Sequence, residues 1–345
     1  MSSSKLLKYN SLAIASLAGC IIGASLERVR NSERFKGIKT GLVASAATVV
    51  PRRELDIVDT STSSSKSSLL SYYPSKIDRI NEIVRHHGYQ ASDTIRIHDN
   101  YVLSYDRKNR TANWVLEHLS PSLLNHPDSK QVDRAKCEFM EDVHVHPFFR
   151  SSNQDYFGSG FDRGHLAAAG NHKVSQDVIN QTFFLSNISP QVGKGFNRDA
   201  WNNLERYVRY RAKNSRNLWI CTGPLYLPRK DPVDGKLYIK YQVIGPNNVS
   251  VPTHFFKVLL IEEIDGSFHL ESYVMANQVL DSNIPLRSYQ VPLESIERSA
   301  GFLIFSQVPE HFFKTINSNN KYLEKFEKSI QQESIHGYRN DRTRA

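Results

Sequence analysis

Two short motifs carry side chains whose types could together cleave a phosphate ester. The first is Asp162-Arg163-Gly164-His165, and the second runs from Asn197 to Glu205. A histidine can take a proton at neutral pH because its ordinary pKa is about 6.5. An asparagine oxygen can bind a hard cation, and an arginine can donate two hydrogen bonds to neighbouring phosphate oxygens. The two motifs therefore predict metal-assisted hydrolysis of a phosphodiester bond.

Each of these side chains also has an ordinary structural explanation when it is considered alone. A single histidine is more often a buried residue bonded to a carbonyl group, and an asparagine at a helix start is more often an N-cap. A glutamate two turns into a helix normally faces water. The order and spacing of the two motifs favour the catalytic interpretation of His165, Asn197 and Glu205.

The residues around the first motif predict a strand, a short helix and a second strand. The apolar run Leu166–Ala169 suggests a short buried strand that carries His165. Ser175 is a typical helix N-cap, and Thr182–Asn187 then has the composition of a strand. The proline in Asn187-Ile188-Ser189-Pro190-Gln191 is expected to turn that segment into a loop.

A helix is predicted from Phe196 to about Lys213, because apolar residues recur there at intervals of three and four. On a regular helix Asn197 and Glu205 share a face but lie about 12 Å apart, which is too far for both to bind one small ion. Asn197 is therefore assigned as the direct metal ligand. Glu205 is expected to act through water or through a neighbouring arginine.

These residues resemble the signature of the DNA/RNA non-specific endonuclease family, and in particular its mitochondrial members. The tetrapeptide Asp162-Arg163-Gly164-His165 matches the central motif of that family, and the likeness extends over residues 74–310. Further matching positions are Asn113–His118, Ser186-Asn187-Ile188, Pro190-Gln191, Asn197, Trp201, Leu204, Glu205, Cys221–Tyr226 and Val251–Lys257.

The resemblance implies an α+β protein with the ββα-metal nuclease fold, in which a mainly antiparallel central sheet has flanking helices. It implies hydrolysis of both DNA and RNA, with His165 as the general base toward water. One hydrated Mg²⁺ ion, for which Mn²⁺ could substitute, would be held by Asn197 and stabilise the transition state and leaving group. The resemblance also implies a homodimer, although the sequence reveals no interface.

Other residues are expected to support the site. Arg163 and Arg107 are candidates for holding the phosphate, although Arg107 could equally be a solvated turn arginine. Asp162 is expected to anchor the turn or Arg163, and Asn187 to position the site without binding the ion.

The basic composition is consistent with a nucleic-acid partner. Lys and Arg outnumber Asp and Glu by 44 − 35 = 9, and a basic surface attracts polyanions. Basic and aromatic residues alternate on the predicted helix near Tyr207, although such a stripe is often only a solvated helix face. The candidates for contacts with nucleic acid are Arg163, Lys194, Arg206 and Arg209.

One endonuclease domain is predicted over residues 74–332, followed by a polar basic tail at 333–345. The Asp265-Gly266 pair predicts a tight hairpin within it. The predicted strands are 94–105, 112–119, 218–226, 236–245, 255–264 and 267–274, and the predicted helices are 175–182, 196–213, 293–299 and 308–332.

The N-terminal region differs in composition from the domain. Residues 1–45 contain an apolar run, 12–26, between basic residues, and residues 46–73 form a Ser/Thr-rich linker expected to be disordered. This leader is expected to direct the chain to mitochondria, in the intermembrane space or at the inner membrane, although a secretory signal would look similar. The expected roles are mitochondrial nucleic-acid turnover and, after relocation to the nucleus, DNA degradation during cell death.

Several alternatives remain open on the sequence alone. His144 and His146 could offer two imidazoles to zinc, but no further ligand pattern accompanies them. Cys137 and Cys221 are too few to make a disulfide scaffold, and Cys221 is expected to be a packed core thiol. The chain could also be a non-catalytic nucleic-acid-binding or membrane-tethered protein on the same fold, or a secreted scavenging nuclease.

Overall fold

The computed structural model describes residues 84–85, 93–281, 283–318 and 320–342. The described residues from Ile95 onward belong to the larger of two units into which the chain divides. The predicted leader and linker lie outside the described residues, so their boundaries stay predictions. No helix in the described part of the chain is long and apolar enough to span a membrane.

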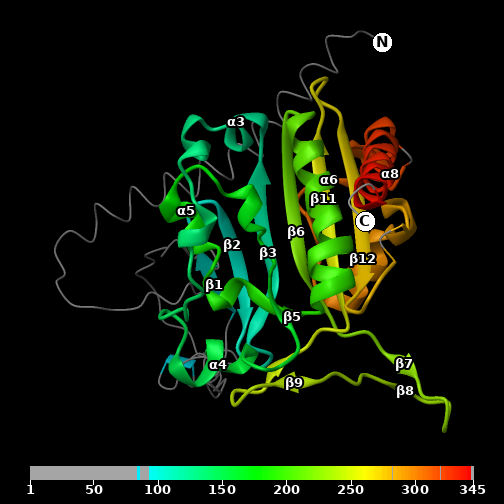
Figure 1. Cartoon of the computed structure of the whole chain (residues 1–345). Coiled ribbons are helices and arrows are strands. Elements are labelled where there is room, and N and C mark those ends of the chain that lie inside the picture. The colour runs from blue at the N-terminus through cyan, green and yellow to red at the C-terminus, as the bar shows by residue number, and fades with distance from the viewer. Residues whose placement is uncertain (1–83, 86–92, 282, 319, 343–345) are drawn as a thin grey trace, which may run out of the picture. The chain divides into compact units, whose positions relative to one another are not determined.

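A mostly antiparallel sheet of seven strands forms the centre of the larger unit (Figure 1), as predicted. Its order is β1-β2-β3-β6-β11-β12-β13; the strands from β2 to β12 are antiparallel neighbours, and β13 pairs with β12 in parallel. The strands are β1 (Thr94–Ile97), β2 (Tyr101–Asp106), β3 (Thr111–Leu119), β6 (Asn217–Leu225), β11 (His254–Glu262), β12 (Phe268–Ala276) and β13 (Phe313–Ile316).

Helices pack against both faces of this sheet. Helix α6 (Trp201–Lys213) packs against the face that carries Ile220, and Figure 1 shows it lying along β6 and β11. Helix α7 (Leu293–Ala300) packs against the face that carries Cys221, which is buried as predicted. Because successive strand residues point to opposite faces, the two helices enclose the sheet between them.

Shorter helices lie in the connections. Three of them are α3 (Pro121–Leu124), α4 (Asn153–Tyr156) and α5 (Gln176–Gln181), and α5 begins after the predicted Ser175 cap, whose hydroxyl accepts from the Val178 amide. The 3-10 turns are η1 (Pro127–Lys130), η2 (Arg134–Lys136), η3 (Pro147–Phe149), η4 (Ala169–Asn171), η5 (Leu185–Asn187), η7 (Leu286–Tyr289) and η8 (Glu310–Phe312).

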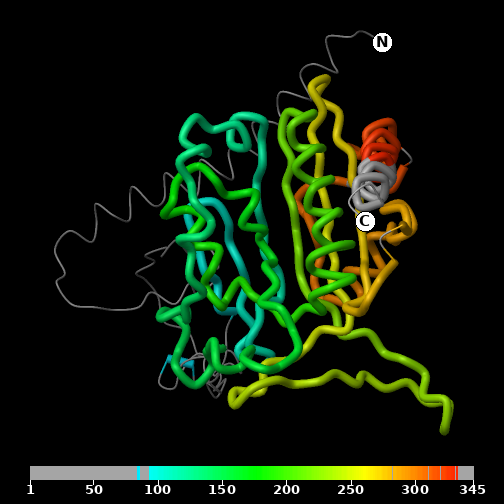
Figure 2. Tube along the Cα trace, viewed as in Figure 1, coloured from blue at the N-terminus to red at the C-terminus, as the bar shows by residue number. Residues whose placement is uncertain are grey.

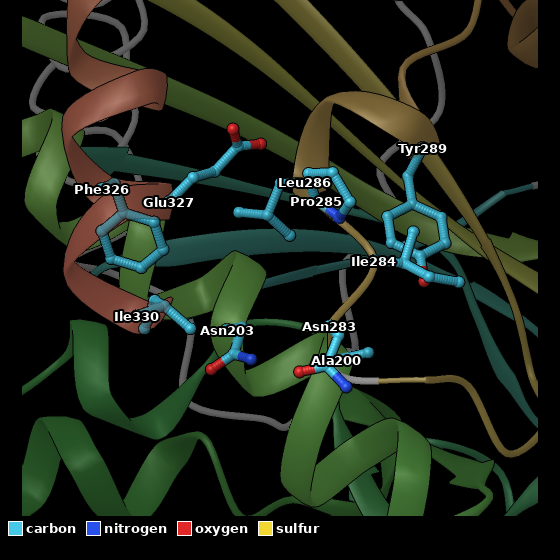
Figure 3. Close-up of a pocket in the computed structure, with 10 residues that line it drawn as sticks. All are labelled: Ala200, Asn203, Asn283, Ile284, Pro285, Leu286, Tyr289, Phe326, Glu327 and Ile330. Atoms are coloured by element: carbon cyan, nitrogen blue, oxygen red, sulfur yellow. The ribbon is translucent and has the colours of Figure 1, made fainter. Parts of the chain in front are cut away.

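The C-terminal part of the chain differs from the predicted single helix at 308–332. Residues 313–316 instead form β13, because pairing with β12 in the sheet outweighs the local helical pattern. Helix α8 (Lys321–Arg342) begins only afterwards and continues past the predicted end of the domain at 332. It packs beside α6, where Phe326 lies 5.4 Å from the ring of Tyr207. Figure 3 shows the small pocket that remains between α6, α8 and η7.

Two other predicted strands are interrupted. The strand expected at 94–105 is broken by a turn in which the His98 amide donates to the Tyr101 carbonyl. The strand expected at 236–245 is reduced to β8 (Leu237–Tyr238) and β9 (Val243–Ile244). Their partners are β7 (Arg229–Lys230) and β10 (Val249–Ser250). By contrast, the hairpin predicted at Asp265-Gly266 joins β11 and β12 as expected.

Residues 228–243 form an extension that is here called the arm. Figure 2 shows the arm projecting away from the sheet. Its side chains Leu237, Ile239, Tyr241 and Val243 are all exposed, although apolar residues at alternate positions are typical of a strand with one buried face. The arm therefore presents an uncovered apolar face in the single chain.

Candidate active site

The first motif forms one strand of a two-stranded hairpin. Strand β4 (Asp162–His165) pairs antiparallel with β5 (Ile188–Gln191), with Gly164 opposite Ser189. A Cβ atom at Gly164 would overlap the side chain of Gln191, so this position requires glycine. The hairpin holds the backbone on either side of His165 in a fixed register.

The second strand of the hairpin lies later in the chain than the sequence pattern predicts. Thr182–Asn187 is a turn region that ends in η5, and the expected loop at 188–191 is the strand. The prediction is wrong because Pro190 does not break the strand but pairs with Arg163 in it. In a ladder of only two strands each residue has one side without a neighbour, so a missing N–H group is tolerated.

Asn187 ties the hairpin to the segment that follows β4. Its Oδ1 accepts from the Ala167 amide at 2.9 Å. Its Nδ2 donates to the carbonyl groups of Ala167 and Thr182, at 3.0 and 2.8 Å. The side chain is completely buried, and its amide is therefore bonded to backbone on both sides.

His165 is buried with one nitrogen that has no partner. The rings of Phe139 and Phe183 lie 5.5 and 4.6 Å from the imidazole, and its Nε2 makes no hydrogen bond to the described residues. Burial, together with the smaller effects of the charges on Arg134 and His172, lowers the pKa of His165 to about 3. The imidazole is therefore neutral at physiological pH.

Asp162 orients the predicted metal ligand. Its Oδ2 accepts from Asn197 Nδ2 at 2.9 Å and from Arg198 Nε at 2.8 Å, and its Oδ1 accepts from Arg198 Nη2 at 2.6 Å. The Arg198 bonds are the main reason why the pKa of Asp162 is lowered. Because a carboxylate can only accept, the amide nitrogen of Asn197 faces Asp162, and Oδ1 is the atom left for a cation.

Arg163 is held by a different partner from the one expected. Asp162 binds Arg198, whereas Arg163 Nη1 donates to Asn153 Oδ1 at 2.7 Å. The Arg163 guanidinium also lies 4.3 Å from the centre of the Phe139 ring. Arg163 is exposed, so its charge faces solvent beside the hairpin.

The segment that carries Asn197 is a π-helix, η6 (Gly193–Ala200), which leads directly into α6. Its first turn contains a kink at Lys194 and Gly195, and the Asn197 amide donates to the Val192 carbonyl at 2.9 Å. Asn277 fastens this segment, because its Oδ1 accepts from the Val192 amide and its Nδ2 donates to the Pro190 carbonyl. Asn277 thus connects the loop after β12 to both the hairpin and the Asn197 segment.

The polar side of α6 places charged groups near this segment. Glu205 is half-buried, and burial raises its pKa while the charges of Lys257 and Arg209 oppose that rise. Arg209 Nη1 donates to Asn171 Oδ1 at 3.3 Å. Glu205 and Arg209 therefore lie close enough to influence each other's protonation.

Sequence reasoning misses Arg134 in η2. Its exposed guanidinium lies 5.9 Å from the centre of the Phe183 ring. Its positive charge lowers the pKa of His165, and it also acts on Glu205 and Arg209. Arg134 lies in a loop without hydrophobic periodicity, so no local pattern could have identified it.

The remaining predicted residues have varied surroundings. Arg107 lies in the turn between β2 and β3, 5.9 Å from the centre of the Phe149 ring. Lys194 is exposed beside the kink, and Arg206 is half-buried on α6. His146 accepts from the Phe148 amide as a helix cap. Within the described residues, no group of three or more His, Cys, Asp or Glu side chains could hold a metal ion.

A histidine on a β-hairpin, followed by a helix that begins with a potential metal-binding asparagine, defines the class of ββα-metal nucleases. The family model described as DNA/RNA non-specific endonuclease matches residues 83–311, and the chain belongs to that family. Membership implies a nuclease that depends on a divalent metal ion.

Known relatives and a solved structure agree with this assignment. Mitochondrial endonuclease G of Caenorhabditis elegans is 51% identical over 76% of this chain and 83% of its own, and that of Homo sapiens is 49% identical over 64% and 73%. A chain from the EndoG/EndoGI complex is 53% identical, with a TM-score of 0.64 over 70% of this chain and 97% of that one. The protein is thus an endonuclease, and its relatives' names support a mitochondrial location.

Proposed function

We propose that the protein is a Mg²⁺-dependent endonuclease that hydrolyses phosphodiester bonds of both DNA and RNA. The observation that carries this proposal is the unpaired Nε2 of a buried, neutral His165 in the β4–β5 hairpin. His165 accepts the proton of the attacking water as that water adds to phosphorus. The fixed register of the hairpin keeps the imidazole in one orientation for this transfer.

The residues fit a hydrated ion that has few protein ligands. Asn197 offers Oδ1, because its nitrogen is bonded to Asp162, and Mg²⁺ retains several waters where a protein supplies few oxygens. When bound, the ion would stabilise negative charge on the phosphate and on the leaving oxygen. Glu205 would act on it through water, and Mn²⁺ is expected to substitute because it takes the same oxygen ligands.

Arginines supply positive charge for the scissile phosphate in this proposal. Arg134 and Arg209 both act on Glu205, which supports placing them around the same bound group. Arg163 is exposed on β4 and can reach a neighbouring phosphate. Lys194 and Arg206 would contact the nucleic-acid backbone beyond the cleavage point. The role assigned to Arg107 stays a prediction.

The decisive experiment measures cleavage of supercoiled plasmid and single-stranded RNA by the purified protein, with Mg²⁺ or with EDTA. Wild-type protein is expected to cut both substrates only with the metal ion. His165→Ala should lower kcat by about 10² to 10⁴, because the general base is lost. Asn197→Ala should raise the Mg²⁺ concentration required for half-maximal activity. A folded wild-type protein that binds but never cuts would support the non-catalytic alternative instead.

We also propose that two copies pair through the arm. The exposed, alternating Leu237, Ile239, Tyr241 and Val243 support this proposal, because a second copy would cover an apolar face that a single chain leaves in water. Light scattering during gel filtration should give the mass of two chains for the wild type. The Leu237→Glu, Ile239→Glu variant should elute with the mass of one chain, and a monomeric wild type would refute the pairing.

The biological setting is proposed at a finer level than a mitochondrial location. We expect the intermembrane space or inner membrane, with roles in nucleic-acid turnover and, after relocation to the nucleus, in DNA degradation during cell death. The mitochondrial names of the relatives disfavour the secreted alternative. The apolar run at 12–26, which would give membrane association, lies outside the described residues.

A further inference from the structure

Glu117 on β3 is a buried carboxylate that the proposed mechanism does not use. Its Oε1 accepts from Asn171 Nδ2 and from His172 Nε2, both at 2.9 Å. The Glu117 side chain has no exposed surface, and that of His172 is 1% exposed. Both donors belong to the segment between β4 and β5, so Glu117 joins the central sheet to the connection inside the hairpin.

Asn171 carries this connection to an arginine of the site. Because a carboxylate only accepts hydrogen bonds, the Asn171 nitrogen must face Glu117, and Oδ1 must face the opposite side. On that side Oδ1 accepts from Arg209 Nη1 at 3.3 Å. A single buried amide thus links Glu117 to Arg209 with a fixed direction.

The backbone beside Asn171 restricts the guanidinium further. A Cβ atom at Gly170 would lie 3.1 Å from Arg209 Nη1 and 3.3 Å from its Cζ, so a side chain there would push the guanidinium out of its place by a few tenths of an ångström. The guanidinium therefore packs directly against the backbone at Gly170 while Asn171 holds one of its nitrogens. Arg209 also acts electrostatically on Glu205, the residue that the proposed function places beside the metal ion.

We propose that Glu117 is a positioning residue that holds the Arg209 guanidinium, through Asn171, in the orientation that binds the substrate phosphate. This inference rests on the proposed role of Arg209 in phosphate binding. An arginine held in advance loses less side-chain entropy when it binds a phosphate, and it presents its donors in one direction.

The charge on Glu117 supports this role. Burial alone would raise the pKa of Glu117, but the hydrogen bond and charge of His172, the charge of Lys257 and the hydrogen bond from Asn171 together lower it. Glu117 is thus ionised at neutral pH and remains an acceptor for Asn171. Its Oε2 and His172 Nδ1 have no hydrogen-bond partner among the described residues. A buried ion with an unpaired atom is a poor source of stability, which favours a functional reason for its presence.

The test is a double-mutant cycle on the purified protein with plasmid DNA. Glu117→Ala should lower kcat/KM by about tenfold to a hundredfold, as is typical when a group behind a ligand-binding side chain is lost. Glu117→Gln should recover much of that loss, because its amide oxygen can still accept from Asn171. In an Arg209→Ala background, Glu117→Ala should cause no further loss, since no guanidinium remains to be positioned.

Two further variants keep the outcome interpretable. Asn171→Ala removes the link while leaving the Glu117–His172 pair in place, and it should reproduce the loss even if Glu117→Ala does not fold. Glu271→Gln, at another buried glutamate of the same sheet, should leave kcat/KM unchanged. Additive losses in the cycle would overturn the positioning role alone. An Arg209→Ala protein with unchanged kcat/KM would instead overturn the phosphate-binding role on which it rests.

Discussion

Glu117 and Glu271 lie in one row across the central sheet, on β3 and β12, yet their hydrogen-bond partners differ. The row passes from Glu117 through Ile220 and Leu259 to Glu271, on the face that α6 covers. Residues paired directly across antiparallel strands share a face, so both carboxylates lie beneath the same helix. An arginine of α6 is associated with each glutamate. Arg209 is linked to Glu117 through Asn171, and Arg211 lies beside Glu271.

Both carboxylate oxygens of Glu271 accept hydrogen bonds, and the donors belong to α6, to β12 and to the residue before α8. The hydroxyl groups of Tyr207 and Tyr273 and the amide of Asn320 all donate to it, and Arg211 Nε lies 4.0 Å from its Oε1. Asn320 also accepts from the Leu323 amide at the start of α8, so Glu271 joins the sheet, α6 and α8. Glu117 keeps one oxygen unpaired and connects instead to the site. A buried carboxylate thus serves either stability or positioning, according to where its donors lead.

Replacing each of the two α6 arginines with alanine should give the largest difference between a loss of activity and a loss of stability. Arg209→Ala should lower kcat/KM by about 10² to 10³, as loss of a transition-state donor does, with a small change in stability. Arg211→Ala should destabilise the fold by about 3 kcal/mol, because it leaves the buried Glu271 and the half-buried Glu263 without their cation. Steady-state cleavage and urea unfolding measure the two effects. Equal loss of activity in both variants would erase the distinction.

Replacing each glutamate with glutamine should give a smaller difference, this time in the free energy of unfolding. Glu271→Gln should cost about 2 kcal/mol of unfolding free energy, because an amide cannot accept from all the donors around Glu271. Glu117→Gln should cost less, since one oxygen still accepts from Asn171 and His172. Urea unfolding of both variants beside the wild type gives the comparison. The prediction fails if Glu117→Gln is the less stable protein.

The pH dependence of stability should differ in sign between the two glutamates. Burial raises the pKa of Glu271 above its ordinary 4.5, so the stability that it contributes is present at low pH and is lost as pH rises through the raised value. The pKa of Glu117 is lowered, so its contribution is present above about pH 4.5 and is lost as pH falls below. Melting curves between pH 3.5 and 7 should therefore show the Glu117→Gln penalty shrinking toward acid while the Glu271→Gln penalty grows. Parallel curves would contradict the assigned environments.

The elements that depend on local spacing could be predicted from the sequence. Ser175 caps α5, the Asp265-Gly266 pair joins β11 and β12, and the apolar spacing after Phe196 marks α6. The prediction failed where distant pairing decides the structure. Pro190 lies in a strand because the hairpin partner is β4, and residues 313–316 form a strand because β12 offers a free edge.

The candidate site divides in the same way. His165 and Asn197 lie in contiguous motifs, and the sequence identified both as candidates, although their roles stay predictions. Arg134, which acts on His165 through its charge, and Glu117, which connects to Arg209 through Asn171, come from a loop and a strand far away in the sequence. A glutamate in a strand looks like a solvent-facing residue, and only the packing of α6 and the segment after β4 reveals that Glu117 is buried.

Strand β12 ends in two loops that offer protein engineers opposite prospects. At the Asp265-Gly266 end, a Cβ atom added to Gly266 would meet nothing within 4 Å, so an inserted tag or reporter domain would extend into open solvent. At the other end, Asn277 is bonded to both Pro190 and Val192, and the Leu280 amide donates to the Gly195 carbonyl. An insertion there would pull on the hairpin and on the segment that carries Asn197. Fusions at the first loop should therefore leave cleavage intact. Fusions at the second loop should abolish cleavage although they change no catalytic residue.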